Sequence, residues 1–229
     1  MEKLIEYAPL LAKGALVTIA LALVSLALAT LLGALGAAGK IGGGRLAQSA
    51  VLVYTTLVRG IPDLVLMLLF YFGGQRILNI TGDALGLPAL NISPFWAGAL
   101  AIGFLYGAYL TETFRGAYMT IPKGQIEAGH ALGLRGFRLH QKVTIPQLVR
   151  FALPGYANVW QVLVKSTAVV SVIGLQDLVG LADKAGKTAR EPFLFFAAVL
   201  LVYLFFTFIS TTIFDALERR YARGTSNAR

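Results

Sequence analysis

Charged side chains within long apolar stretches are the first candidates for chemistry in this sequence. Asp63 and Glu112 are carboxylates in such stretches, and Arg59 and Lys165 are cations. A charge at the centre of a membrane-spanning helix costs about 2.5 to 3.5 kcal/mol on insertion scales, so it normally faces a partner or a wet cavity. A carboxylate in such a cavity can bind a cationic solute. Asp63 and Glu112 are therefore candidate substrate-binding residues.

Neutral hydrogen-bonding side chains surround the last of these charges. Gln161, Ser166 and Thr167 lie close to Lys165, and amides and hydroxyls of this kind can bind the head group of an amino acid. We include these three residues in the candidate substrate site. Aromatic residues in the same stretches could wall a cavity, although at this spacing ordinary helix packing is the more common role: Phe70, Tyr71, Tyr106 and Tyr109.

Mutual pairing of the charges is the structural alternative. Arg59 and Asp63 are four residues apart and Glu112 and Arg115 three apart, which is salt-bridge spacing on a helix. Pro62 weakens this alternative for Asp63 because proline breaks the helix there. Broken helices in transporters tend to line the substrate site, since free backbone groups are tolerated only beside a cavity.

The sequence offers no site for nucleotide, metal or nucleophilic catalysis. The segment GLADKAGKT, residues 180–188, resembles a phosphate-binding loop, but five residues separate its glycines where four are needed. There is no cysteine, and the two histidines form no HExxH motif. We therefore expect neither a catalytic site nor a cofactor in this chain.

Composition assigns the chain to the membrane. Of its 229 residues 57% are hydrophobic and only 14% are charged, against about 25% in ordinary globular proteins. A net charge of +9 would indicate nucleic-acid binding in a soluble protein, but in a membrane protein it bears first on orientation. The fold class expected is an all-α membrane protein, with membrane lipid and no nucleic acid as its surroundings.

Five stretches are long enough to cross a bilayer, and no linker divides them, so the sequence predicts a single domain over 1–229. The first is too long for the apolar core of a removable signal peptide, which is the competing interpretation. In the second, Gly60 and Pro62 predict a break. In the third, Gly103 and Gly107 predict a small-residue packing face. The predicted spans are 14–38, 49–75, 94–114, 151–173 and 192–214.

The distribution of Lys and Arg predicts the orientation of these spans. An odd number of spans places the two termini on opposite sides. With the amino terminus outside, twelve Lys and Arg residues fall in inner segments and six in outer segments, as the positive-inside rule requires. The carboxyl terminus and the segment 115–150 are therefore expected to be cytoplasmic.

The segment 115–150 reads as two short helices joined by a glycine turn, and a plain solvated connection is the default interpretation. However, Glu127-Ala128-Gly129, Gly133 and Pro146 resemble the EAA motif of bacterial ABC-importer permeases. Gly129, Val143 and Ile145 depart from it mildly. In that family the motif forms a coupling loop that docks on the ATPase, so the resemblance implies this role for Glu127, Ala128, Gly129, Gly133 and Pro146.

The resemblance extends over almost the whole chain. The segments 54–75, 103–128 and 152–178, with AGKTAREPFLFF and LERRYARG, are similar to permeases for polar amino acids, most closely the HisQ-type subunit of histidine/lysine/arginine/ornithine importers. This implies a type I importer fold in the bacterial inner membrane and import of cationic amino acids. It also implies partners: a dimer of ABC ATPase subunits that binds ATP and Mg, a second HisM-like permease or another copy, and an external solute-binding protein.

Two other functions compete with this interpretation. An ion-gradient-driven secondary transporter or channel often contains inverted repeats, which five unrepeated spans do not provide, and it would have no use for the EAA-like segment. A membrane scaffold without transport would not explain a broken helix that carries Asp63.

Overall fold

The computed structural model describes residues 2–86 and 91–222, and every regular element within them is helical. The elements are α1 (Glu2–Gly42), α2 (Arg45–Arg59), α3 (Asp63–Leu68), the π-helical η1 (Leu69–Gly73), α4 (Gly74–Leu85), α5 (Pro94–Met119), α6 (Lys123–Ala131), α7 (Gly136–Leu139), the π-helical η2 (His140–Thr144), α8 (Ile145–Ser166), the 3₁₀-helical η3 (Thr167–Ile173), α9 (Leu178–Ala189) and α10 (Pro192–Ala222).

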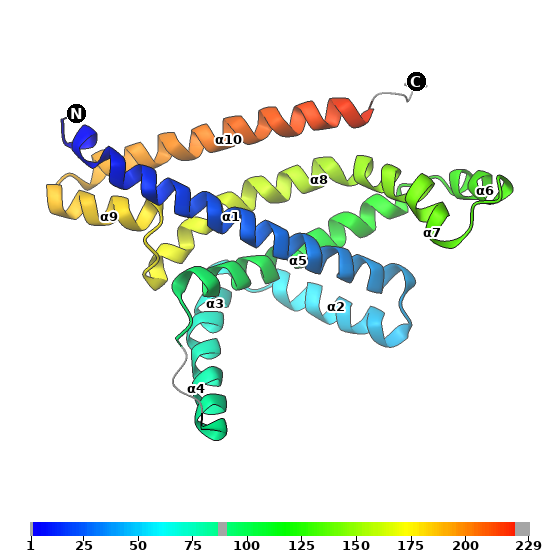
Figure 1. Ribbon diagram of the computed structural model, residues 1–229, viewed down its shortest axis with the longest axis horizontal. Helices are drawn as coiled ribbons and strands as arrows, with labels where there is room; N and C mark the ends of the chain where they lie inside the picture. The colour runs from blue at the N-terminus through cyan, green and yellow to red at the C-terminus, as the bar shows by residue number, and fades with distance from the viewer. Residues whose placement is uncertain (1, 87–90, 223–229) are drawn as a thin grey trace.

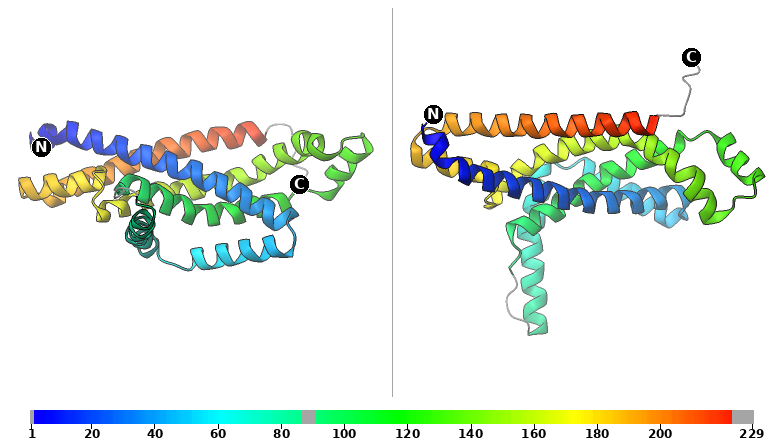
Figure 2. Two further views of the ribbon diagram at one scale, coloured as in Figure 1. Left: turned by 60° about the horizontal axis from the view of Figure 1, so that its bottom comes forward. Right: turned by 45° about the horizontal axis from the view of Figure 1, so that its top comes forward.

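Long helices form an elongated bundle. Helices α1, α5, α8 and α10 run along its length, and α2 lies beside the half of α1 that is nearer to its carboxyl end (Figure 1). Helix α9 lies at the end that holds the amino terminus, and α6 and α7 lie at the opposite end (Figure 2). Helix α4 stands out to one side of the bundle in Figure 1 and in the right view of Figure 2.

The structure confirms an all-α chain with five helical segments long and apolar enough to cross a membrane. These segments are Lys3–Gly42, Asp63–Leu85, Pro94–Met119, Gly136–Ile173 and Pro192–Tyr221. The second segment differs from the predicted range 49–75, because the helix break separates α2 from the span. The predicted loop 115–150 is also shorter, because α5 continues to Met119 and the fourth segment of spanning length already begins at Gly136.

Small residues let α1 and α5 approach each other closely. A Cβ atom on Gly103 would lie 2.7 Å from Cβ of Leu28, and one on Gly33 would lie 2.6 Å from Cβ of Leu110. Neither side chain can be added without moving a helix. The predicted packing face at Gly103 is therefore confirmed, and its partner is α1.

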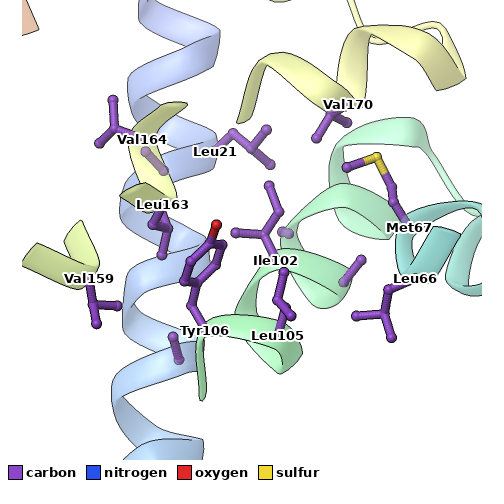
Figure 3. Close-up of a cluster of buried hydrophobic side chains, with 14 of the residues drawn as sticks. Leu21, Leu66, Met67, Ile102, Leu105, Tyr106, Val159, Leu163, Val164 and Val170 are labelled. Atoms are coloured by element: carbon purple, nitrogen blue, oxygen red, sulfur yellow. The ribbon is translucent and has the colours of Figure 1, made fainter. Parts of the chain in front are cut away.

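The main apolar core lies where α1, α3, α5, α8 and η3 meet. Its side chains include Leu21, Ile102, Leu105 and Leu163, each at most 2% exposed. Figure 3 shows that the ring of Tyr106 lies within this cluster and carries its hydroxyl into it. The core therefore surrounds a polar group, which the next subsection describes.

Candidate functional site

The carboxylate of Asp63 lies where two helices depart from regular geometry. Helix α2 ends at Arg59, and Pro62 precedes the first residue of α3. Proline at that position has no N–H to donate, so the helix restarts at Asp63 instead of continuing from α2. On the facing element, α8 changes to the 3₁₀ segment η3 after Ser166. The predicted break at Pro62 is confirmed, and it places Asp63 inside the bundle.

Two uncharged hydroxyls hold this carboxylate. The Tyr106 hydroxyl donates to Oδ2 of Asp63 at 3.0 Å, and the Ser166 hydroxyl donates to the same oxygen at 2.9 Å. The two hydroxyl oxygens are 2.5 Å apart. Asp63, Ser166 and Met67 line a cavity of only about 10 Å³. The structure therefore brings two of the predicted site residues together and closes tightly around them.

A much larger cavity lies beside the break, on the α2 side. It measures about 730 Å³, and its lining comes from α1, α2 and α5: Lys40, Gln48, Leu52, Thr55, Thr56, Arg59, Gly60, Tyr109, Glu112 and Arg115. The guanidinium carbon of Arg59 lies 5.0 Å from the ring centroid of Tyr109. No ion pair joins Arg59 to Asp63 among the described residues, so the pairing alternative does not hold for them.

Glu112 in this cavity is held by two cations. Its Oε1 accepts a hydrogen bond from Nζ of Lys40, and its Oε2 accepts one from Nε of Arg115 at 2.9 Å. Lys40 also donates to Oγ1 of Thr55 at 2.9 Å, which ties α1, α2 and α5 together. The pairing alternative therefore holds for Glu112 and Arg115.

Three other candidates lie away from Asp63. Gln161 donates to Oγ1 of Thr211 in α10 at 3.2 Å. Thr167 is fully buried and donates to the carbonyl oxygen of Val164. Lys165 lines a separate cavity against α10. Gln161 and Thr167 therefore do not join the group formed by Asp63 and Ser166.

Sequence reasoning gave Tyr106 and Tyr109 helix packing as the more common role and the wall of a cavity as the alternative, and Tyr109 does line the large cavity. They are three residues apart on α5, and their ring centroids lie 5.7 Å apart. One ring supplies the hydroxyl on Asp63 and the other lies under Arg59. The available signal was their spacing, which places them one turn apart on a helix.

A compact projection ends the bundle at α6 and α7. Helix α6 is joined to α7 by a turn that contains Gly133, and both Gly133 and Gly136, the first residue of α7, have positive φ, of 77° and 52°. The amide of Gly133 donates to the carbonyl of His130, which closes the end of α6 as a glycine cap does. The expected two helices and glycine turn are present, although the second helix continues through η2 into α8.

Close packing explains one departure from the EAA pattern. Gly129 is buried, and a Cβ atom there would lie 2.5 Å from Cδ1 of Leu139 and 3.3 Å from Cγ2 of Val143. Alanine at this position would require the Leu139 side chain to move. Glu127 and Ala128 lie on the exposed face of α6, and Pro146 is exposed near the start of α8.

Two apolar side chains missed by sequence reasoning lie on the same projection. Leu132 is 81% exposed and Phe137 is 76% exposed, one on each side of the glycine turn. Arg135 and Arg138 are exposed beside them. The signal was present in the sequence as two large apolar residues in an otherwise polar segment. Exposed apolar residues rimmed by charge are typical of a docking surface.

Residues 29–223 match the family model described as "Binding-protein-dependent transport system inner membrane component". The chain belongs to this family. The match covers the helix break, the Asp63 group, the large cavity and the α6–α7 projection, so all of them are parts of a permease subunit.

Curated relatives agree with this assignment along almost the whole length. The histidine/lysine/arginine/ornithine transport system permease protein HisQ of Escherichia coli (strain K12) is 47% identical over 94% of this chain and 95% of its own. The octopine transport system permease protein OccQ of Rhizobium radiobacter is 40% identical over 90% and 88%. The arginine ABC transporter permease protein ArtQ of Haemophilus influenzae is 36% identical over 95% and 96%.

Solved structures confirm the fold. An amino acid ABC transporter crystallised with histidines matches with a TM-score of 0.78 at 30% identity, over 95% of this chain and 96% of that chain. The MetNI methionine ABC transporter in an inward-facing conformation matches with a TM-score of 0.71 at 19% identity, over 95% and 99%. The fold is thus that of ABC-importer permeases.

Proposed function

We propose that this chain is the membrane-spanning subunit of an ATP-driven importer of cationic amino acids. The observation that carries the proposal is the carboxylate of Asp63, which is placed at a helix break within the bundle and, among the described residues, is held by hydroxyls and by no cation. A carboxylate without a protein cation is suited to an ammonium or guanidinium group. Relatives named for histidine, lysine, arginine and ornithine, or for arginine, support the substrate class.

The substrate-facing residues in this proposal are Asp63 and Ser166. Glu112 is assigned instead to holding α1 against α5, because both of its oxygens already accept from cations. Gln161 and Thr167 are assigned to packing against α10 and within α8.

The proposed partners follow from family membership. An ABC ATPase dimer binds ATP and Mg and docks on the α6–α7 projection. A second permease subunit, either HisM-like or another copy of this chain, completes the pathway, and an external solute-binding protein delivers the amino acid. The chain lies in the bacterial inner membrane with its amino terminus outside, as the excess of Lys and Arg in the inner segments supports.

Reconstitution into lipid vesicles tests the function. The complex of permease and ATPase subunits is expected to take up arginine only when ATP is on the ATPase side and binding protein is on the other side. Uptake that needs neither but follows a proton or sodium gradient would instead establish a secondary transporter.

Substitution at the projection tests the docking role. Glu127→Lys and Gly133→Asp are expected to reduce copurification of the ATPase, because one reverses an exposed charge and the other strains a backbone with φ of 77°. Asp215→Asn, at an exposed carboxylate on α10, is the control. Normal copurification with substrate-stimulated hydrolysis in both variants would leave the projection as a simple connection.

Labelling of introduced cysteines tests the orientation, since the chain has none of its own. Glu6→Cys is expected to react with an impermeant reagent applied outside intact cells, and Ser226→Cys, which lies outside the described residues, is expected to be protected. The reverse pattern would invert the topology.

A further inference from the structure

The large cavity carries more positive than negative charge. Of the described residues, three cations line it, namely Lys40, Arg59 and Arg115, and one carboxylate, Glu112. Lys40 and Arg115 both bind Glu112. Arg59 has no carboxylate within 4 Å among the described residues. Among the described residues, the lining therefore carries two more positive than negative charges, and Arg59 is the cation that pairs with no carboxylate.

The side chain of Arg59 is oriented by an aromatic ring. Its guanidinium carbon lies 5.0 Å from the centroid of the Tyr109 ring, and the residue is exposed to the cavity of about 730 Å³. A guanidinium group over a ring face keeps its in-plane N–H groups free. Those groups match the two oxygens of a carboxylate and can bind both at once.

Arg59 and Asp63 form a pair of opposite charges on either side of the helix break. Gly60, Ile61 and Pro62 separate them in the chain. Tyr109 under Arg59 and Tyr106 on Asp63 are one turn apart on α5, with ring centroids 5.7 Å apart. Arg59 lines the large cavity and Asp63 lines the small one. An amino acid that reaches from one to the other would meet a cation at one end and an anion at the other.

We infer that Arg59 binds the α-carboxylate of the transported amino acid while Asp63 binds its cationic side chain. This inference rests on the proposed function and adds a second specificity-determining residue to it. The two residues then determine different parts of the substrate specificity. Arg59 selects solutes with an α-carboxylate, and Asp63 selects those with a positively charged side chain. A decarboxylated amine of the same shape satisfies Asp63 alone.

Equilibrium binding to the complex of permease and ATPase subunits, without binding protein, tests the inference. The probes are arginine and agmatine, which is arginine without its carboxylate. Arg59→Gln is expected to weaken arginine binding by about 10- to 150-fold, the loss of one charge-assisted pair, and to leave agmatine binding unchanged. Arg59→Lys is expected to recover part of the arginine affinity, because it restores the charge without the planar fork.

Arg150→Gln is the matched control. Arg150 also lies over an aromatic ring, with its guanidinium carbon 5.6 Å from the Phe151 centroid, but it does not line the cavity. This variant is expected to bind both probes as the wild type does. The thermal midpoint of each purified complex shows whether it is folded.

Three outcomes would overturn the inference. If Arg59→Gln weakens arginine and agmatine equally, Arg59 shapes the site without contacting the carboxylate. If arginine binding is unchanged in Arg59→Gln, Arg59 is outside the site. In both cases arginine binding by the wild type leaves the proposed function intact. A wild-type complex that binds neither probe would overturn the inference and the proposed substrate site together.

Discussion

Two carboxylates within the membrane-spanning helices have opposite surroundings. Glu112 is held by the cations Lys40 and Arg115, whereas Asp63 is held by the hydroxyls of Tyr106 and Ser166. The hydroxyls donate hydrogen bonds to Asp63 but bring no positive charge to it. The two cations beside Glu112 carry more positive charge than its single negative charge. Under the proposed function, this difference assigns Glu112 to stabilising the bundle and leaves the carboxylate of Asp63 available to a substrate.

The largest expected effect is at Glu112. Glu112→Gln removes the carboxylate that faces Lys40 and Arg115, and the Lys40 side chain is only 12% exposed. Removing one partner of a fully buried pair costs about 3 to 5 kcal/mol. This pair is partly buried, with Glu112 22% exposed, so we expect a cost near the lower end of that range. We expect a clear drop in the thermal midpoint of the detergent-purified chain, and partial recovery when Lys40→Met is added. A Glu112→Gln variant as stable as the wild type would show that the pair is not structural.

Asp177 shows what burial alone does to the pKa of a carboxylate, because no cation pairs with it among the described residues. It is fully buried and accepts a hydrogen bond from the Gly180 amide at the start of α9, while its Oδ2 has no partner among the described residues. Burial raises the pKa of Asp177 from 3.8 to about 6. The folded protein therefore binds this proton more tightly than the unfolded chain does.

The sign of the pH dependence follows from this shift. The stabilisation by protonated Asp177 is complete below pH 3.8 and is lost as the pH rises through about 6. The loss amounts to about 3 kcal/mol at neutral pH. Asp177→Asn keeps a capping side chain, so we expect it to raise the thermal midpoint at pH 7 but not at pH 4. An equal effect at both pH values would rule out titration of Asp177.

Asp63 is expected to affect substrate more than stability. Asp63→Asn removes a charge-assisted contact, and we expect arginine uptake to weaken by about 10- to 150-fold, with a neutral amino acid barely affected and binding-protein affinity unchanged. Asp83→Asn, at an exposed carboxylate of α4 in the same helical run, is the control. Equal losses for neutral and cationic substrates would make Asp63 a structural residue.

Much of this arrangement could be predicted from local sequence. The break at Pro62, the five apolar spans and the glycine turn at Gly133 depend on neighbouring residues and on helix geometry, which composition and spacing report directly. The motif and the wider resemblance supplied the family. These are features that a short segment determines by itself.

The partners of each charge could not be predicted, because they depend on contacts between distant segments. Lys40 and Glu112 are 72 residues apart, and Asp63 and Ser166 are 103 apart. Helical periodicity does not state which helix a face meets. The spacing of Arg59 and Asp63 suggested an ion pair. Because the helix breaks between them, the Arg59 side chain lies over Tyr109 and the Asp63 side chain contacts Tyr106.

The smallest expected effect on stability is at the other end of α1. An exposed lysine–glutamate pair there can be compared with the partly buried pair of Lys40 and Glu112. Lys3 Nζ lies 2.7 Å from Oε1 of Glu191, with the two side chains 47% and 44% exposed. The Lys3 ammonium, which donates this hydrogen bond, holds the pKa of the Glu191 carboxyl below its usual value. That stabilisation is present above the unfolded pKa and is lost as the pH falls. Water and salt screen an exposed pair, so its contribution is small.

We expect Glu191→Gln to lower the thermal midpoint at pH 7 far less than Glu112→Gln does, with the difference from wild type vanishing in high salt or at acidic pH. Equal losses in the two variants would show that burial does not decide what each end of α1 contributes.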